Sequence, residues 1–333
     1  MRSFFPKNGK FYKVNMHCHT VISDGKMTPE EIKEAYLAEG YSAVAFTDHE
    51  VFFPHHELTD ETFVALAGYE TAIKEFPDLH TGIFRRAYHI NLIARRADIL
   101  RQPFANPDIL TPGNCAAHFD PDNCDELLTY AFSPEGVSDL VRRANERGFF
   151  AFYNHPAWSM MPEDDYSKIE GLWGVELMNT DSFLLGDCHA GPLVSFLRVG
   201  ERLLPVGGDD NHNARGLEGS FGAFTMLSAT SLTYESLSEA IENGCGYASN
   251  GPLILDIAYD DAKIYVKTSP AARIILLSEG RYAKCVQGEG IEEAIFKRNP
   301  AKTGEFVRFE VVDAQGRRAI SRAYFEEEFV CEG

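Results

Sequence analysis

The chain has 333 residues, 44% of them hydrophobic and 24% charged, and a formal net charge of −19 at pH 7. This length and apolar content suffice for one large packed domain and a smaller one, and they exclude wholesale disorder. The negative charge argues against nucleic acid or an anionic membrane as a bulk partner, because both are themselves negatively charged.

Cysteine usage and the N-terminus indicate the compartment. The seven cysteines are an odd number without CxxC spacing, so a disulfide framework is not expected. The first residues lack the apolar core of a signal peptide. No segment approaches the roughly 20 apolar residues that are needed to cross a bilayer. We therefore expect a soluble, cytoplasmic protein that does not enter a membrane.

The first helix is predicted at residues 28–40. Thr28 suits the N-cap, a proline stands at the first helical position, and Glu31 lies where a capping box requires it. Gly40 ends the pattern. The apolar residues 41–49 follow as a buried strand, so this helix leads into a strand.

The same succession of helix and strand returns twice. Residues 133–148 have a helical pattern and lead into a strand at 149–156. Residues 189–203 do the same before the strand at 204–212. This alternation predicts an α/β fold with a parallel sheet or barrel that is covered by helices.

Two further regions depart from this alternation. Residues 97–132 are rich in Pro, Asn and Asp and too long for an ordinary connection, so we expect a lid or a substrate-binding insertion within a domain at 1–250. After about residue 250 the pattern changes to short β-like runs separated by turn residues, with a hairpin turn at 313–316. We expect 251–333 to form a small all-β, sandwich-like module.

The segment Val14–Gly25, "VNMHCHTVISDG", raises the possibility of a metal site. Residues i and i+2 of a strand face the same side, so His17 and His19 can reach one ion while Cys18 points away. A single pair of this kind is weak evidence in a chain with 11 histidines.

The case for metal rests on similar polar residues at the ends of other predicted strands or just after them. The full set of candidate ligands is His17, His19, Asp24, His49, Glu70, His89, His155, Asp210 and His212. Imidazole and carboxylate ligands without thiolate suit Zn, Fe or Mn. Nine ligands exceed the capacity of one ion, so we expect two or three divalent ions.

The segments that carry these residues also resemble a known family. "HCHTVISDG", "TDHE", "AGYE", "YHINL", "NHP" and "GGDDNH", in this order, resemble the PHP (polymerase and histidinol phosphatase) family of metallohydrolases over about residues 12–250. The resemblance implies a distorted (β/α)7 barrel with a trinuclear metal site at the C-terminal ends of the strands. The region after residue 250 resembles the C-terminal extension of a PHP-like subgroup whose substrates are varied.

The resemblance also implies a distribution of ligands over three ions. One ion takes His17, His19, Glu70 and Asp210; a second shares Glu70 and takes His89 and His155; a third takes Asp24, His49 and His212. Two alternatives stay open at this stage. His80 competes with His89 for the second ion, and Asp209 competes with Asp210 for the first.

Neighbouring residues have predicted roles of their own. Asp48, next to His49, is expected to orient a metal ligand. Trp158 and Tyr153 flank the "NHP" segment, and residues of this kind more often belong to the core than to a substrate platform.

This chemistry predicts a hydrolase. A water that bridges two ions has a lowered pKa and can attack an ester, and three divalent ions outweigh the charge of three carboxylates. The most natural substrate is a small phosphorylated metabolite or a short nucleotide. Glu70, His89, His155 and Asp210 are the expected catalytic residues, and Arg215, Arg85 or Arg86 would bind the phosphate. A carboxylic or carbamic ester hydrolase and a non-catalytic PHP-like binding module are the alternatives.

Overall fold

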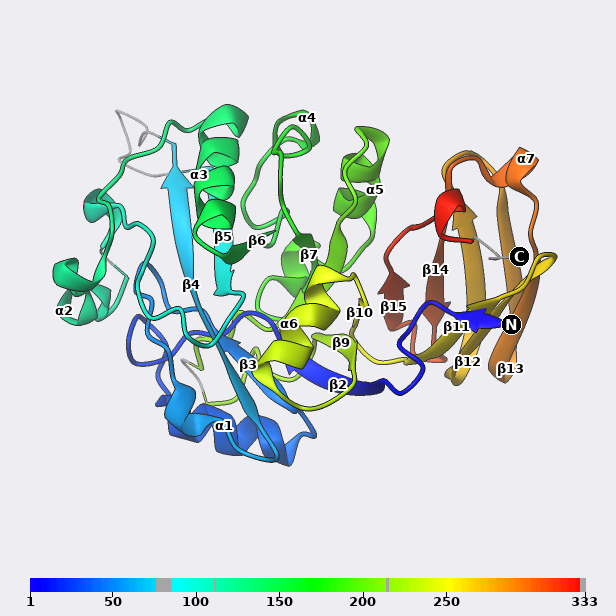
Figure 1. Cartoon of the computed structure of the whole chain (residues 1–333), viewed down its shortest axis with the longest axis horizontal. Coiled ribbons are helices and arrows are strands. Elements are labelled where there is room, and N and C mark those ends of the chain that lie inside the picture. The colour runs from blue at the N-terminus through cyan, green and yellow to red at the C-terminus, as the bar shows by residue number, and fades with distance from the viewer. Residues whose placement is uncertain (76–84, 111, 214–215, 330–333) are drawn as a thin grey trace.

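The computed structural model describes residues 1–75, 85–110, 112–213 and 216–329. These residues form a mixed α/β region with parallel strands, followed by an antiparallel β region that contains the C-terminal strands (Figure 1). In the described part of the chain, no helix is long and apolar enough to span a membrane.

Six strands of the α/β region pair in parallel in two groups. The first group is β2 (Lys10–Asn15), β3 (Ala43–Phe46) and β4 (Val64–Lys74). The second group is β6 (Phe149–Tyr153), β7 (Gly174–Asn179) and β8 (Leu204–Gly208). The expected parallel pairing is therefore present within each group.

The strand between the two groups departs from this expectation. β5 (Ala87–Ala94) is antiparallel to both β4 and β6. β4 ends at Lys74 and β5 begins at Ala87, a separation at the lower limit for the crossover that a parallel pair requires. The reversal places the beginning of β5 beside the C-terminal ends of its neighbours.

The strand order runs from β2 through β3, β4, β5, β6 and β7 to β8. Among the described strands, β8 pairs with β7 alone, so a closed seven-stranded barrel stays a prediction. However, the segments that follow β2 and β8, the first and last strands in this order, contact each other. The amide of Asp210 donates to the carbonyl of His17 at 2.9 Å, and that of His19 donates to the carbonyl of Asn211 at 3.3 Å.

Four helices of eight or more residues pack on these strands: α1 (Pro29–Ala38), α3 (Pro134–Glu146), α5 (Gly191–Arg198) and α6 (Tyr234–Glu242). α1 confirms the predicted start, because Thr28 and Glu31 form the capping box, and Gly40 follows it with φ 75°. α3 buries one apolar face, formed by Val137, Leu140, Val141 and Ala144. The short helices are α2 (Cys115–His118), α4 (Glu163–Tyr166) and α7 (Pro300–Thr303), with 3₁₀ turns at η1 (His56–Leu58), η2 (Pro107–Ile109), η3 (Pro121–Asn123), η4 (Phe183–Leu185) and η5 (Glu326–Glu328).

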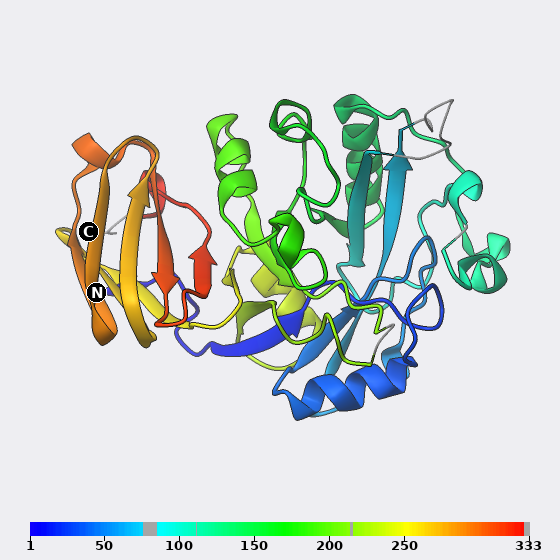
Figure 2. The same ribbon diagram turned by 180° about the vertical axis from the view of Figure 1, so that it is seen from behind.

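The antiparallel region is continuous with the α/β region. β9 (Phe224–Ala229) pairs with β2, β10 (Gly246–Ser249) pairs with β9, and β15 (Arg318–Ser321) pairs with β10. Its other strands are β11 (Ile254–Tyr259), β12 (Lys263–Ser278), β13 (Ala283–Lys297), β14 (Phe306–Val312) and β16 (Tyr324–Phe325). The predicted hairpin turn joins β14 to β15, where Gly316 has φ 84°. β1 (Arg2–Ser3) pairs with β11, so the start of the chain lies in this region together with the C-terminal strands (Figure 2).

The segment 97–132 contains η2, α2 and η3 and packs on the loop that follows β2. The amide of Asn114 donates to the carbonyl of Ser23 at 2.6 Å, and its side-chain amide donates to the carbonyl of Val21 at 2.9 Å. This segment therefore contacts the loop that carries Asp24.

Candidate metal centre

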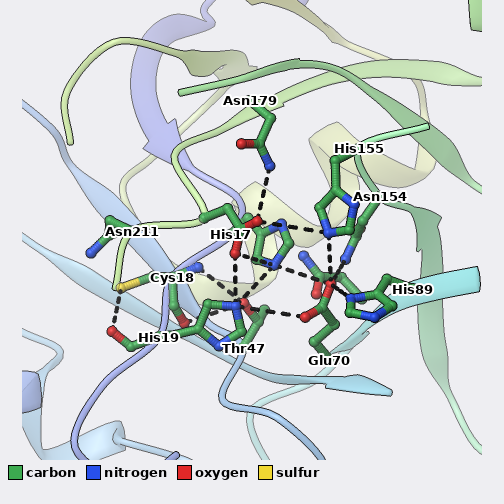
Figure 3. A network of polar contacts seen from close by, with 12 residues as sticks. His17, Cys18, His19, Thr47, Glu70, His89, Asn154, His155, Asn179 and Asn211 are labelled. Atoms are coloured by element: carbon green, nitrogen blue, oxygen red, sulfur yellow. Dashed lines mark hydrogen bonds and ion pairs between the residues drawn. The ribbon is translucent and has the colours of Figure 1, made fainter. Parts of the chain in front are cut away.

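The nine candidate ligands lie together at one edge of the strands. His17, His19 and Asp24 follow β2, and the other ligands come from β4 and β5 or from the loops after β3, β6 and β8. His89 lies near the start of β5 rather than at a strand end. It reaches the same edge because β5 runs antiparallel to β4, with His89 opposite Ala72. Figure 3 shows how His17, His19, His89 and His155 converge around Glu70.

Glu70 is the centre of the cluster, and its two oxygens face different histidines. Oε1 lies 3.1–3.3 Å from ring nitrogens of His89, His17 and His155. Oε2 lies 3.0 Å from Nδ1 of His49 and 3.6 Å from Nε2 of His19. One carboxylate therefore separates two groups of imidazoles, which is the arrangement that a bridging ligand requires.

Asp210 faces the same cluster. Its Oδ1 lies 2.9 Å from Nε2 of His19 and 3.3 Å from Nε2 of His17, and its Oδ2 lies 3.7 Å from Nε2 of His155. Asp209 has different partners: its carboxylate accepts hydrogen bonds from the Tyr36 and Thr180 hydroxyls and from three backbone amides, those of Phe221, Gly222 and Ala223. The geometry thus favours Asp210 over Asp209 as a ligand.

A second part of the cluster surrounds Asp24. Its carboxylate oxygens lie 3.4 Å from Nε2 of His212, 3.6 Å from Nε2 of His49 and 3.9 Å from Nδ1 of His19. The predicted third ligand group therefore gathers around Asp24, with His19 as an additional member. His19 offers one ring nitrogen to this group and the other to Asp210.

The polar atoms of the cluster have the properties of metal ligands. His19 Nδ1, Glu70 Oε2 and both ring nitrogens of His89 are buried and lack a hydrogen bond of acceptable geometry. Buried polar atoms in native proteins are nearly always satisfied, so such a group of orphans indicates a missing partner. Imidazole and carboxylate atoms suit divalent Zn, Fe or Mn, and four overlapping ligand groups indicate a site for more than one ion.

The charges in the cluster support this interpretation. Burial alone raises the pKa of Glu70, but His89, His17 and His49 hold it well below its usual range. Burial lowers the pKa of His17, yet Asp210, Glu70 and Glu176 together raise it well above its usual range. Glu70 and the neighbouring histidines therefore favour each other's charged forms.

Two candidate ligands have an unusual backbone conformation. His155 has φ 26° and Asp210 has φ 54°, both in the region that favours glycine. Such conformations cost about 1–3 kcal/mol each and cluster at functional sites. Their presence at two of the nine positions fits side chains that are aimed at a common target.

The sequence did not reveal Glu176, which lies within β7 and is 1% exposed. Its Oε1 lies 3.3 Å from Nδ1 of His17, and its Oε2 accepts hydrogen bonds at 3.0 Å from the amide of His155 and the side chain of Asn179. The only signal in the sequence is a carboxylate inside the apolar run "GVELMN". Asn154 was missed as well, although its side-chain amide donates to Glu70 at 2.6 Å.

Asp48, which was expected to orient a metal ligand, contacts the loop that carries the candidate ligand Asp24. Its carboxylate accepts hydrogen bonds from the amide of Thr20 and the hydroxyl of Ser23, each at 2.7 Å. The Ser23 hydroxyl also lies 3.2 Å from Asp24. Asp48 therefore fixes the loop that positions Asp24.

The structure describes only some of the residues that were expected to bind the phosphate of the substrate. Arg215 and His80 lie outside the described residues. Arg85 and Arg86 line a cavity of about 330 Å³ that also borders His49 and His89, and Arg86 forms an ion pair with Glu75 at 2.9 Å. Lys74 lines the same cavity and was not predicted.

Comparison with known proteins identifies part of the chain. The family model of the PHP domain matches residues 15–102. The chain contains a PHP domain. The match includes six of the nine candidate ligands: His17, His19, Asp24, His49, Glu70 and His89. The other three candidate ligands lie beyond the matched residues, but the fold brings them into the same cluster.

Two solved structures are similar to this chain. A two-domain protein of Bacteroides vulgatus, which contains a predicted PHP-like metal-dependent phosphoesterase, is 14% identical over 97% of this chain and 98% of its own, with a TM-score of 0.45. An amidohydrolase from Chromobacterium violaceum with bound sulfate and no metal is 19% identical over 60% of this chain and 87% of its own, with a TM-score of 0.41. No curated protein matches the chain.

Proposed function

We propose that this protein is a metal-dependent phosphoesterase that hydrolyses a small anionic ester. The observation that supports the proposal is the cluster of six histidines and three carboxylates, which brings all nine candidate ligands together and in which six of them are buried. A PHP domain that had lost turnover would be expected to have lost ligands as well, and this chain retains all nine.

The ligands form four overlapping groups, which share His17, His19, His49 and Glu70. Glu70 bridges two groups of histidines through its two oxygens, and His19 belongs both to the group around Asp210 and to the group around Asp24. Two or three divalent ions bound here would lower the pKa of a water molecule and neutralise charge on the ester oxygens. Glu70, His89, His155 and Asp210 are proposed to act as ligands closest to that reaction.

The charge of the site depends on Glu176. With Asp24, Glu70 and Asp210 it makes four carboxylates, so three divalent ions leave a surplus of two positive charges and two ions leave none. The cavity beside the cluster is lined by Lys74, Arg85 and Arg86, of which Arg86 pairs with Glu75, and by the carboxylate of Glu50. With three ions bound, the positive site would favour a small anionic substrate over a neutral one in a chain of net charge −19.

The test is product release by manganese-loaded protein from three chromogenic esters: p-nitrophenyl phosphate, bis-p-nitrophenyl phosphate and p-nitrophenyl acetate. His155→Ala removes a ligand from the cluster, and His118→Ala removes an exposed histidine from α2 as the matched control. We expect turnover of a phosphate ester that is retained in His118→Ala and lost in His155→Ala.

The other outcomes contradict the proposal in different ways. Turnover of the acetate alone would establish a carboxyl ester hydrolase. No turnover of any ester by protein with stoichiometric metal would indicate a binding module. Equal turnover by His155→Ala and the unchanged protein would place the activity outside this cluster.

A further inference from the structure

Trp158 is an exposed aromatic residue beside the candidate metal centre. Its side chain is 43% exposed, although its ring centroid lies only 5.0 Å from that of His89 and 4.8 Å from that of His155. The sequence-based interpretation of Trp158 as a core residue is therefore wrong, whereas Tyr153 is fully buried as expected. A large exposed indole in contact with two candidate ligands needs an explanation other than core packing.

The turn that presents Trp158 is firmly anchored. The backbone amides of Ala157 and Trp158 donate to the two oxygens of the Asp187 carboxylate at 2.8 and 3.0 Å. The hydroxyl of Ser182 donates to the same carboxylate at 2.8 Å, and Asp187 is 3% exposed. A buried carboxylate thus holds the indole in place, so its exposure is a built feature of the loop rather than the result of a loose turn.

The indole forms part of the cavity of about 330 Å³ that borders His49 and His89. Its lining includes three apolar side chains, those of Trp158, Ile109 and Pro112. It also includes three cationic side chains, those of Lys74, Arg85 and Arg86, beside one carboxylate, Glu50. The volume is at the lower end of the range for small-molecule sites. The cavity therefore offers an anion site and a flat apolar surface within reach of the metal centre.

We propose that Trp158 determines substrate specificity by stacking against an aromatic ring in the leaving group of an anionic ester. This inference rests on the proposed function, and it adds the class of substrate. Indole faces pack best against flat partners, and stacking of one ring on an aromatic side chain is worth about a tenfold change in affinity or more. Ile109 and Pro112 belong to the segment 97–132, which supports its predicted role in substrate binding.

The chain contains two tryptophans, which makes a direct binding measurement possible. Trp173 donates to Asn145 at 2.7 Å and stacks near Arg95, at a ring-to-guanidinium distance of 4.3 Å, so it is engaged elsewhere. In a Trp173→Phe variant, Trp158 is the single tryptophan, and excitation at the long-wavelength edge of indole absorption excludes emission from the tyrosines. This variant is expected to retain the activity of the unchanged protein.

The probes are two phosphonates of similar size that cannot be hydrolysed: benzylphosphonate and cyclohexylmethylphosphonate. Each is titrated into manganese-loaded Trp173→Phe protein while the emission of Trp158 is recorded. We expect benzylphosphonate to change the emission with a Kd about tenfold lower than that of cyclohexylmethylphosphonate. Equal Kd values, or saturable binding by a second method without a change in emission, would overturn the proposal.

Substitutions of Trp158 supply a second readout by isothermal titration calorimetry. Trp158→Leu is expected to abolish the preference for benzylphosphonate, and Trp158→Phe is expected to retain most of it because a flat ring remains. Loss of the preference in both variants would contradict a stacking role. Because the phosphonates report binding without turnover, a ring preference without ester hydrolysis would reject the proposed function alone, and hydrolysis without a ring preference would reject this inference alone.

Discussion

Glu176 and His17 form a buried pair in which the carboxylate controls the orientation of the imidazole. Glu176 Oε1 lies 3.3 Å from Nδ1 of His17, and the opposite nitrogen, Nε2, lies 3.3 Å from both Glu70 and Asp210. A proton held on Nδ1 by the carboxylate leaves the lone pair on Nε2 directed at the cluster. Carboxylates of this kind are the usual partners of metal-binding histidines.

Glu176→Gln is expected to weaken metal binding about 10- to 100-fold without unfolding the protein. The amide removes the negative charge, and its NH2 group can no longer accept the hydrogen bonds that Oε2 receives from the amide of His155 and the side chain of Asn179. Manganese affinity is measured by competition with a fluorescent chelator. Glu292→Gln, an exposed position on β13, is the matched control. Unchanged affinity in Glu176→Gln would show that His17 does not need this partner.

Asp209 and Asp210 are adjacent in sequence but are expected to respond differently to substitution by Asn. In Asp209→Asn, the new amide NH2 would face hydrogen-bond donors such as the Tyr36 hydroxyl and the amide of Phe221. An unsatisfied buried donor costs about 1–3 kcal/mol, so the free energy of unfolding should fall by this amount in metal-free protein.

Asp210→Asn is expected to reduce the metal content with a smaller effect on the stability of metal-free protein. Asp210 contacts mainly the imidazoles of the cluster. It therefore contributes charge to the cluster and little to the packing of the fold. Denaturant unfolding after chelation and metal analysis before it separate the two effects. If Asp209→Asn lost metal and Asp210→Asn did not, Asp209 rather than Asp210 would be the metal ligand.

The sequence allowed the cluster to be predicted because its ligands occupy strand ends in a recognisable order. The i, i+2 spacing of His17 and His19 placed both side chains on one face, and Asp210 with His212 repeated that spacing. The capping box of α1 was equally local and was confirmed. Such features are predictable because neighbouring residues in the chain determine them.

The features that were missed depend on contacts between distant parts of the chain. Glu176 has no spacing pattern, and its role follows only from the 3.3 Å approach of His17, which is 159 residues away. The reversed direction of β5 leaves no mark on its apolar pattern, because parallel and antiparallel buried strands have similar compositions. The exposure of Trp158 likewise depends on the turn that Asp187 anchors.

Removal of metal is expected to lower the melting temperature of the protein. The cluster contains buried charged groups and orphaned polar atoms that bound ions would satisfy, whereas the unfolded chain offers no comparable site. Binding to the folded state alone adds about 2.7 kcal/mol of stability when the free ion is at 100 times its Kd. The measurement is thermal unfolding across a manganese titration after treatment with EDTA.

Asp210→Asn is the control for this titration, because it removes a ligand and should flatten the dependence of melting temperature on manganese. Lys267→Gln, at an exposed position on β12, should follow the unchanged protein. A melting temperature that is independent of manganese in the unchanged protein would contradict a metal site in the cluster.

The N-terminal residues are expected to stabilise the C-terminal β region. β1 pairs with β11, and the ring centroid of Phe4 lies 4.3 Å from that of Tyr324, 4.7 Å from that of Tyr259 and 5.0 Å from that of Phe329. Phe4→Ala removes these contacts and should lower the free energy of unfolding by about 2 kcal/mol. Denaturant unfolding monitored by circular dichroism gives this value.

Leu255→Ala is the matched control, since Leu255 lies on β11 but is 50% exposed, and the expected change is within about 0.5 kcal/mol. Metal content should be unaffected in both variants, because Phe4 packs on the antiparallel region rather than on the ligand loops. A Phe4→Ala protein as stable as Leu255→Ala would show that the packing of the Phe4 ring contributes little. A Phe4→Ala protein that loses metal would instead show that the antiparallel region supports the site through β15, β10 and β9, the strands that connect it to β2.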